Sequence, residues 1–176
     1  VFSLHDHQIT ARKVAEKSVR IERNRTEMLP VTFTERDRLL LIGPKIGRKL
    51  DIGVHAHEIE LAGYFEQYHV SMVEKTIPLE IDAETSELLC NVSRNVSAII
   101  FDASFRLPSG QPGILNDDHI ALLKRLNAVN SRIIILALNP FIISQIPFAD
   151  TVIFTYGRNR YALERATTLI FGKGRE

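Results

Sequence analysis

Polar side chains suited to ligand binding follow several short apolar runs of the sequence. Asp102 and Ser104 come directly after Ala98–Phe101, and Arg106 belongs to the same loop. Asn139 and Arg158 follow two later apolar runs. Carboxylate, hydroxyl, amide and guanidinium groups hydrogen-bond polar ligands. These five residues are therefore candidate binding residues, although an aspartate at the end of a strand also commonly caps a helix or stabilises a loop.

A glycine-containing loop, Gly43–Lys49, follows another apolar run, which is where phosphate sites occur. The spacing from Gly43 to Gly47 fits neither the P-loop nor the dinucleotide-binding pattern. Pro44 also removes a backbone donor that a phosphate cradle needs. The loop is thus predicted to be a structural turn, and no cofactor is expected.

The histidines do not form a metal-binding pattern. His55 and His57 lie in a segment predicted to be helical, where side chains two residues apart diverge. His5 and His7 lie in the polar stretch at the start of the sequence and are expected to be exposed. No metal site is therefore predicted.

Residues for nucleophilic or phosphoryl-transfer chemistry are incomplete. Cys90 lies inside a predicted helix, and no Gly-x-Ser-x-Gly motif occurs. A phosphoacceptor site would need an acidic pair after the first strand of the main body, but that strand ends at Gly43-Pro44. Taken alone, the residues present no complete catalytic set.

The elements that position these residues alternate between apolar runs and amphipathic segments. Strands are predicted at 19–23, 39–42, 70–77, 98–101, 132–138 and 151–155, and helices at 6–19, 54–68, 83–94, 117–130 and 159–171, with a helical turn at 141–145. Such alternation predicts an α/β fold, a three-layer α/β/α sandwich with a mostly parallel central sheet of about five or six strands. Ligands of such sheets bind at the carboxyl ends of the strands.

Two helices illustrate the predicted buried faces. In the first helix, Ile9, Val14, Ala15 and Ser18 form a partial apolar stripe. In the segment 83–94, which Asp82 is expected to cap, Leu88, Leu89 and Val92 are predicted to face inward.

The chain of 176 residues, with 45% hydrophobic and 24% charged residues, has the composition of one globular domain. A single cysteine excludes a disulfide framework, and the apolar runs are shorter than the about 20 residues needed to span a bilayer. Residues 1–49 hold 11 basic and 6 acidic side chains, whereas the rest holds 11 and 15. Without interleaved aromatic residues, this basic region is not expected to bind nucleic acid.

The Leu29-Pro30 step separates an N-terminal arm, residues 1–36, from the sandwich body, residues 37–176, and the two are expected to form one domain. The sequence opens at Val1 without a signal-peptide pattern, as if cut from a longer chain. The sequence is compatible with the bacterial cytoplasm and with the cell wall or the extracellular space.

Several segments resemble one family in the same order. Ala11–Asn24 and Met28–Val31 resemble the helix, strand and Leu-Leu-Pro turn that open the C-terminal domain of family 3 glycoside hydrolases. Leu39–Pro44 and Arg132–Phe141 resemble two of its buried strands, and Ala149–Gly157 with Ala166–Gly172 resemble its closing segment. Among subfamilies, the sequence looks most like the bacterial β-N-acetylhexosaminidases, which act on N-acetylglucosaminides.

The resemblance implies a parent enzyme in which a (β/α)8 barrel precedes this domain and carries the nucleophilic aspartate. Family 3 enzymes are retaining, so they also need an acid and base. In the β-glucosidase branch a glutamate of this domain supplies that group, from a loop corresponding to 102–113, but this loop contains no glutamate. The absence of this glutamate favours the hexosaminidase branch, in which a histidine of the barrel acts as the acid and base.

The leading hypothesis is therefore an accessory C-terminal domain that packs on the barrel, borders the substrate cleft and is inactive alone. Its basic arm would then face an acidic barrel surface through Arg20, Arg23 and Arg25. The alternative is a free-standing doubly wound domain that binds a small ligand or another protein, because fold alone does not determine function.

Overall fold

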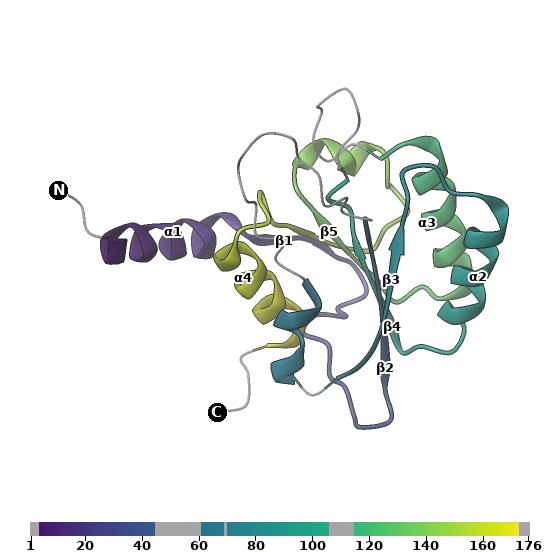
Figure 1. Cartoon of the computed structure of the whole chain (residues 1–176), viewed down its shortest axis with the longest axis horizontal. Coiled ribbons are helices and arrows are strands. Elements are labelled where there is room, and N and C mark those ends of the chain that lie inside the picture. Colours follow the sequence, from purple (N-terminus) through teal and green to yellow (C-terminus); the bar gives the residue numbers. More distant parts are fainter. Residues whose placement is uncertain (1–3, 45–60, 69, 106–114, 173–176) are drawn as a thin grey trace.

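The computed structural model describes residues 4–44, 61–68, 70–105 and 115–172. A six-stranded sheet forms its centre, in the order β1-β6-β5-β4-β2-β3 (Figure 1). The strands are β1 (Arg20–Asn24), β2 (Arg38–Pro44), β3 (Ser71–Ile77), β4 (Ala98–Asp102), β5 (Ile133–Ala137) and β6 (Thr151–Phe154). All neighbouring pairs are parallel except β1 and β6, which are antiparallel. The predicted α/β sandwich with a mostly parallel sheet is confirmed.

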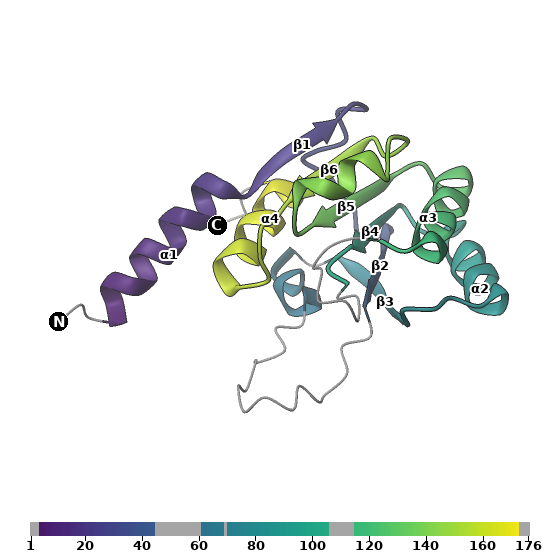
Figure 2. The same cartoon turned by 90° about the horizontal axis from the view of Figure 1, so that it is seen from above.

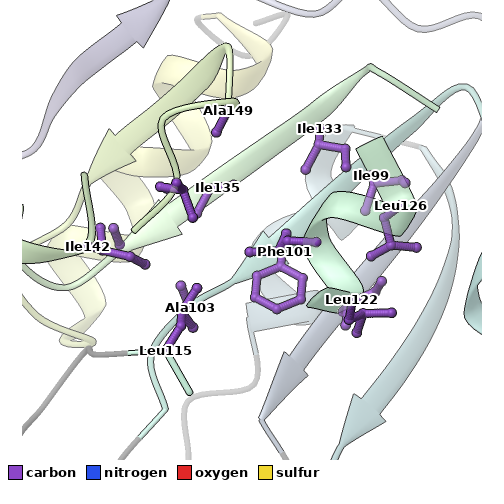
Figure 3. Close-up of a cluster of buried hydrophobic side chains, with 14 of the residues drawn as sticks. Ile99, Phe101, Ala103, Leu115, Leu122, Leu126, Ile133, Ile135, Ile142 and Ala149 are labelled. Carbon is purple, nitrogen blue, oxygen red and sulfur yellow. The ribbon is translucent and has the colours of Figure 1, made fainter. Parts of the chain in front are cut away.

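Helices cover both faces of this sheet. The described helices are α1 (Leu4–Ser18), which extends away from the sheet (Figure 2), α2 (Ala83–Ser93), α3 (Asp117–Val129) and α4 (Arg160–Phe171), with the 3-10 turns η1 (Leu61–Tyr64), η2 (Glu66–Tyr68) and η3 (Pro140–Ser144). On one face, Leu122 and Leu126 of α3 pack with Phe101 and Ile135 of the sheet (Figure 3). On the other face, α4 and η1 cover the sheet. Every residue of β4 and β5 is buried, which explains their nearly continuous apolar sequences.

Local capping sets the helix ends. Asp82 caps α2, accepting a hydrogen bond of 2.7 Å from the Thr85 amide through Oδ1, as predicted. Asn159 caps α4 in the same way, and α4 ends at Gly172, whose φ of +80° lies in the left-handed region.

One helix prediction is wrong for a buried residue, and another differs from the structure in the type of helix where it is described. Leu88 is 53% exposed on α2, because adjacent residues of a helix point in different directions and its neighbour Leu89 takes the buried position. The predicted helix 54–68 is described only from Leu61 onward, where the backbone forms the short turns η1 and η2. Its part before Leu61 lies outside the described residues.

The predicted apolar stripe of the first helix is also largely solvent-exposed. Ala15 is buried, but Ile9 and Val14 are exposed. The reason is that α1 extends away from the sandwich (Figure 2). Arg12 connects it to α4, lying over the Tyr161 ring at 5.6 Å from the ring centroid.

Candidate functional site

The carboxyl ends of the parallel strands form one edge of the sheet, here called the carboxyl edge. The register pairs Asp102 of β4 with Leu136 of β5, and Ala137 of β5 with Phe154 of β6. Residues that follow β4, β5 and β6 therefore emerge side by side. Four of the five candidate binding residues fall within the described part of this edge, and Arg106 lies outside the described residues.

Asp102 is the centre of a hydrogen-bonded cluster at this edge. Its Oδ1 accepts from the Ser104 amide at 3.1 Å and from the Ser104 hydroxyl. Its Oδ2 accepts from Arg158 Nη1 at 2.8 Å. The same Nη1 donates to Ser104 Oγ at 2.6 Å. The fold thus brings together Asp102, Ser104 and Arg158, which are separated by up to 56 positions in the sequence.

Burial differs between the two charged members. The Asp102 side chain is 8% exposed, whereas the Arg158 side chain is 25% exposed. Burial raises the pKa of Asp102, although Arg158 and the Ser104 hydrogen bonds act in the opposite direction. Arg158 therefore lies partly at the surface, and the more deeply buried Asp102 holds its guanidinium group in place.

The cluster suits recognition rather than bond cleavage. A retaining glycosidase needs two carboxyl groups that can reach the scissile bond. Both oxygens of Asp102 are already bound by Ser104 and Arg158, and the carboxylate is almost fully covered. Asp102 therefore holds the guanidinium group of Arg158 in place, together with Ser104.

Asn139 follows β5, the strand between β4 and β6. Its side-chain oxygen accepts from the Phe141 amide at 3.0 Å and caps η3. Asn139 therefore lies at the carboxyl edge, where its described hydrogen bond stabilises the turn, and its role as a binding residue stays a prediction.

The aromatic side chains at the carboxyl edge are not among the candidates that the sequence predicts. Among the described residues, Phe141 and Tyr156 are the exposed aromatic ones, at 74% and 44%. Tyr156 has a φ of +54°, which is uncommon for a residue with a Cβ. Its ring packs against Phe154 with centroids 5.7 Å apart, and Arg20 lies over it at 5.9 Å. The sequence signal that could have identified Tyr156 is an aromatic residue that precedes a glycine, Gly157, at the end of a predicted strand.

The three arginines of the N-terminal arm have different environments. Arg23 donates to three backbone carbonyls, those of Ile146 at 2.8 Å and of Ala149 and Ile143 at 3.4 Å. Arg25 donates to the Pro147 carbonyl at 3.0 Å. Both therefore connect the N-terminal arm to residues 143–149, the end of η3 and the segment after it.

Arg20 is the most outward of the three. It pairs with Glu22 at 3.2 Å, and 59% of its side chain is exposed. Contact between these arginines and another domain stays a prediction.

Other sequence candidates are only partly described. Lys45–Lys49 of the glycine-containing loop and the pair His55 and His57 lie outside the described residues. Within the described ranges, no group of three or more histidine, cysteine or acidic side chains is arranged to hold a metal ion. No helix in those ranges is long and apolar enough to cross a membrane.

Comparisons with known proteins give matches among solved structures alone. No family model matches the sequence, and no curated protein matches it. A fungal multi-domain family 3 β-N-acetylglucosaminidase superposes with a TM-score of 0.74 at 17% identity, over 98% of this chain and 19% of that chain. The family 3 β-N-acetylglucosaminidase from Paenibacillus sp. strain FPU-7 gives 0.71 at 19% identity, over 99% and 32%. The chain has the fold of a domain of family 3 glycoside hydrolases.

The same fold occurs beyond the N-acetylglucosaminidases. A β-glucosidase from Listeria innocua superposes with a TM-score of 0.74 at 12% identity, over 99% of this chain and 26% of that chain. The chain therefore spans between 19% and 32% of the length of these structures. The resemblance noted from the sequence is confirmed at the level of the fold.

Proposed function

We propose that this chain is the accessory C-terminal domain of a retaining family 3 glycoside hydrolase that acts on β-N-acetylglucosaminides. In this proposal the domain packs on a (β/α)8 barrel that carries the catalytic groups, and it is inactive alone. The observation that carries it is the superposition of nearly the whole chain on a minor part of two β-N-acetylglucosaminidases.

The chemistry of the carboxyl edge supports an accessory role. Asp102, the acidic residue at the centre of the cluster, is held by Ser104 and Arg158 and is not available as a nucleophile or acid. The loop 102–113 contains no glutamate that would act as in the β-glucosidase branch. The N-acetylglucosaminide specificity rests on this departure and on the sequence resemblance.

The position of the cluster also suits the border of a cleft between two domains. Ligands of parallel α/β sheets bind outside the carboxyl ends of the strands. Tyr156 and Phe141 are exposed there, and Arg158 is partly exposed. The barrel domain would face this edge, so that these side chains line one wall of the substrate cleft.

The experiment compares the natural protein that contains this domain with residues 1–176 alone. Both are incubated with a chromogenic N-acetyl-β-glucosaminide and with the matching β-glucoside. We expect the natural protein to cleave the N-acetylglucosaminide preferentially and the isolated chain to cleave neither. Specific turnover by the isolated chain would contradict the accessory role, and preference for the glucoside would contradict the proposed substrate.

A further inference from the structure

His119 is a titratable side chain in the core that takes no part in the hydrogen-bonded cluster at the carboxyl edge. It lies in the first turn of α3 and is completely buried. Neither of its ring nitrogens, Nδ1 and Nε2, has a hydrogen-bond partner among the described residues. Buried polar groups almost always have such a partner, and leaving one without it costs free energy. The ring is therefore held in the core by packing rather than by hydrogen bonds.

The packing partner of His119 is Phe105, which follows β4. The two ring centroids are 4.0 Å apart, at an interplanar angle of 41°. Phe105 is itself buried, and its ring centroid lies 5.9 Å from that of Phe101. Phe105 directly follows Ser104, whose amide and hydroxyl donate to Asp102. The contact between His119 and Phe105 therefore joins the start of α3 to the carboxyl-edge cluster.

The first turn of α3 is also connected to the segment that follows β3. The Asn116 side chain accepts from the His119 amide at 2.9 Å and donates to the Leu79 carbonyl at 2.6 Å. Asp118 Oδ2 accepts from the Ile81 amide at 3.4 Å. Movement of this turn would therefore break these hydrogen bonds together with the ring contact.

A positive charge on His119 would make its buried position unfavourable. Burial lowers the pKa of His119 and outweighs the Pro78 carbonyl and the Asp118 carboxylate, which act in the opposite direction. Phe105 brings no charge to the ring, and Asp118 is the charged group of the described structure that acts on its pKa. In water the pKa of the ring returns to its ordinary value of 6.5. A form in which His119 is exposed and charged is thus increasingly favoured as the pH falls below 6.5.

We propose that residues 116–119, the first turn of α3, form a latch that packs on Phe105 while His119 is uncharged and opens in mildly acidic solution. In the open form the charged ring is hydrated, and Phe105 loses its support. Because Ser104 precedes Phe105, opening also loosens the hydrogen bonds from Ser104 to Asp102. Acid thus weakens the carboxyl-edge cluster through a residue outside it. The latch is a property of the fold and does not depend on the proposed function.

The first test follows the protonation of His119 in residues 1–176 by NMR, between about pH 4 and 8. We expect the ring to titrate with a pKa below 6.5. Hydrogen exchange at three backbone amides measures the opening itself, since each donates to a side chain that the latch contains or supports. These are the amides of Ser104, Ile81 and His119, which donate to Asp102, Asp118 and Asn116.

The protection factor of each amide corrects for the intrinsic pH dependence of exchange and measures the opening equilibrium. Because opening takes up one proton, the three factors should fall by up to about tenfold per pH unit between 6.5 and the folded-state pKa of His119. The opening free energies should stay below the free energy of global unfolding from urea denaturation. The Ala162 amide, bonded to the Asn159 cap of α4 at 3.0 Å, is the matched control and should lose less protection.

Two variants remove the titrating group and keep an apolar side chain against Phe105. In His119→Leu, and in His119→Met as a second variant, we expect the three amides to keep their protection from pH 7 to about pH 5. His7→Gln is the control, because His7 is exposed on α1, and it should leave the acid response of the unchanged chain intact. Circular dichroism checks that each variant is folded.

Four results would overturn the latch. They are a His119 ring that titrates at or above 6.5, three amides that keep their protection in acid, variants that lose protection as the unchanged chain does, and opening free energies equal to that of global unfolding at every pH. None of these results depends on hydrolysis by the natural protein, so failure of the latch and failure of the proposed function are separate outcomes.

Discussion

Removal of Arg158 should destabilise the domain more than removal of the charge on Asp102. In Arg158→Met, the nearly covered Asp102 carboxylate loses its charged partner at 2.8 Å, and Ser104 Oγ loses a donor at 2.6 Å. In Asp102→Asn, an acceptor remains for Ser104 and Arg158, and the unpaired guanidinium can turn toward water because a quarter of the side chain is already exposed.

The expected magnitudes follow from this difference in burial. Leaving a buried charge without its partner costs about 3–5 kcal/mol, and partial exposure of Arg158 places this pair at the lower end, about 3 kcal/mol. Replacement of a charged hydrogen-bond acceptor by a neutral one costs about 1–2 kcal/mol. Arg158→Met is therefore expected to cost about 1–2 kcal/mol more than Asp102→Asn at neutral pH.

The cost of Arg158→Met should also depend on pH. Burial raises the pKa of Asp102 in the folded state, and loss of Arg158 raises it further. The folded state then binds the proton more tightly than the unfolded state, whose carboxyl titrates near 3.8. The stability of the variant is retained below that pH and falls as the pH rises through the folded-state pKa. The difference in free energy of unfolding between Arg158→Met and the unchanged chain therefore increases from acid to neutral pH.

Urea denaturation followed by far-ultraviolet circular dichroism, at several pH values between 4 and 8, measures these free energies of unfolding. Arg160→Met is the matched control, because Arg160 is exposed and pairs with Glu164 one helical turn away, a contact worth about 0.5 kcal/mol or less. Equal costs of Arg158→Met and Asp102→Asn at neutral pH, or a cost of Arg158→Met that does not change with pH, would refute the reasoning.

Further predictions concern residues outside the cluster. Arg23→Met should cost about 2 kcal/mol and speed amide hydrogen exchange in residues 143–149, because three carbonyls lose their donor; unchanged exchange would contradict this. Hydrogen bonds from Ser97 and Thr34 lower the pKa of Asp37 to about 2, so the unchanged chain should lose stability as the pH falls from about 4 toward 2, and Asp37→Asn should lack this loss in acid denaturation. Burial lowers the pKa of His119, so stability should fall as the pH drops below 6.5, and His119→Leu should flatten that dependence in urea titrations.

Much of the fold could be predicted from local sequence signals. Asp82 and Gly172 stand at helix ends whose capping chemistry is specific, and β4 up to Phe101 and all of β5 are apolar because both faces of the sheet are covered. Leu88 was assigned to the wrong face, since two adjacent leucines fit the helical period equally well. The exposure of Ile9 depends on where α1 leaves the sandwich, which periodicity does not specify.

The candidate site was predicted less completely. Its place at the strand ends follows from the parallel sheet, which predicts Asp102, Ser104 and Arg158 as candidates. Their contact depends on the strand order β4-β5-β6 and on the length of the arginine side chain, which reaches across β5. Local sequence patterns predict neither of these. The sequence does not predict the position of Tyr156, because its left-handed backbone is a tertiary feature.

Complementation is the most direct test of the proposed function. The natural protein is divided so that residues 1–176 and the remainder are purified separately, and hydrolysis of a chromogenic N-acetyl-β-glucosaminide is measured for each part and for the mixture. We expect no turnover by residues 1–176, weak turnover by the remainder, and an increase when the two are mixed. Turnover by residues 1–176 alone, or a mixture no more active than the remainder, would contradict the accessory role.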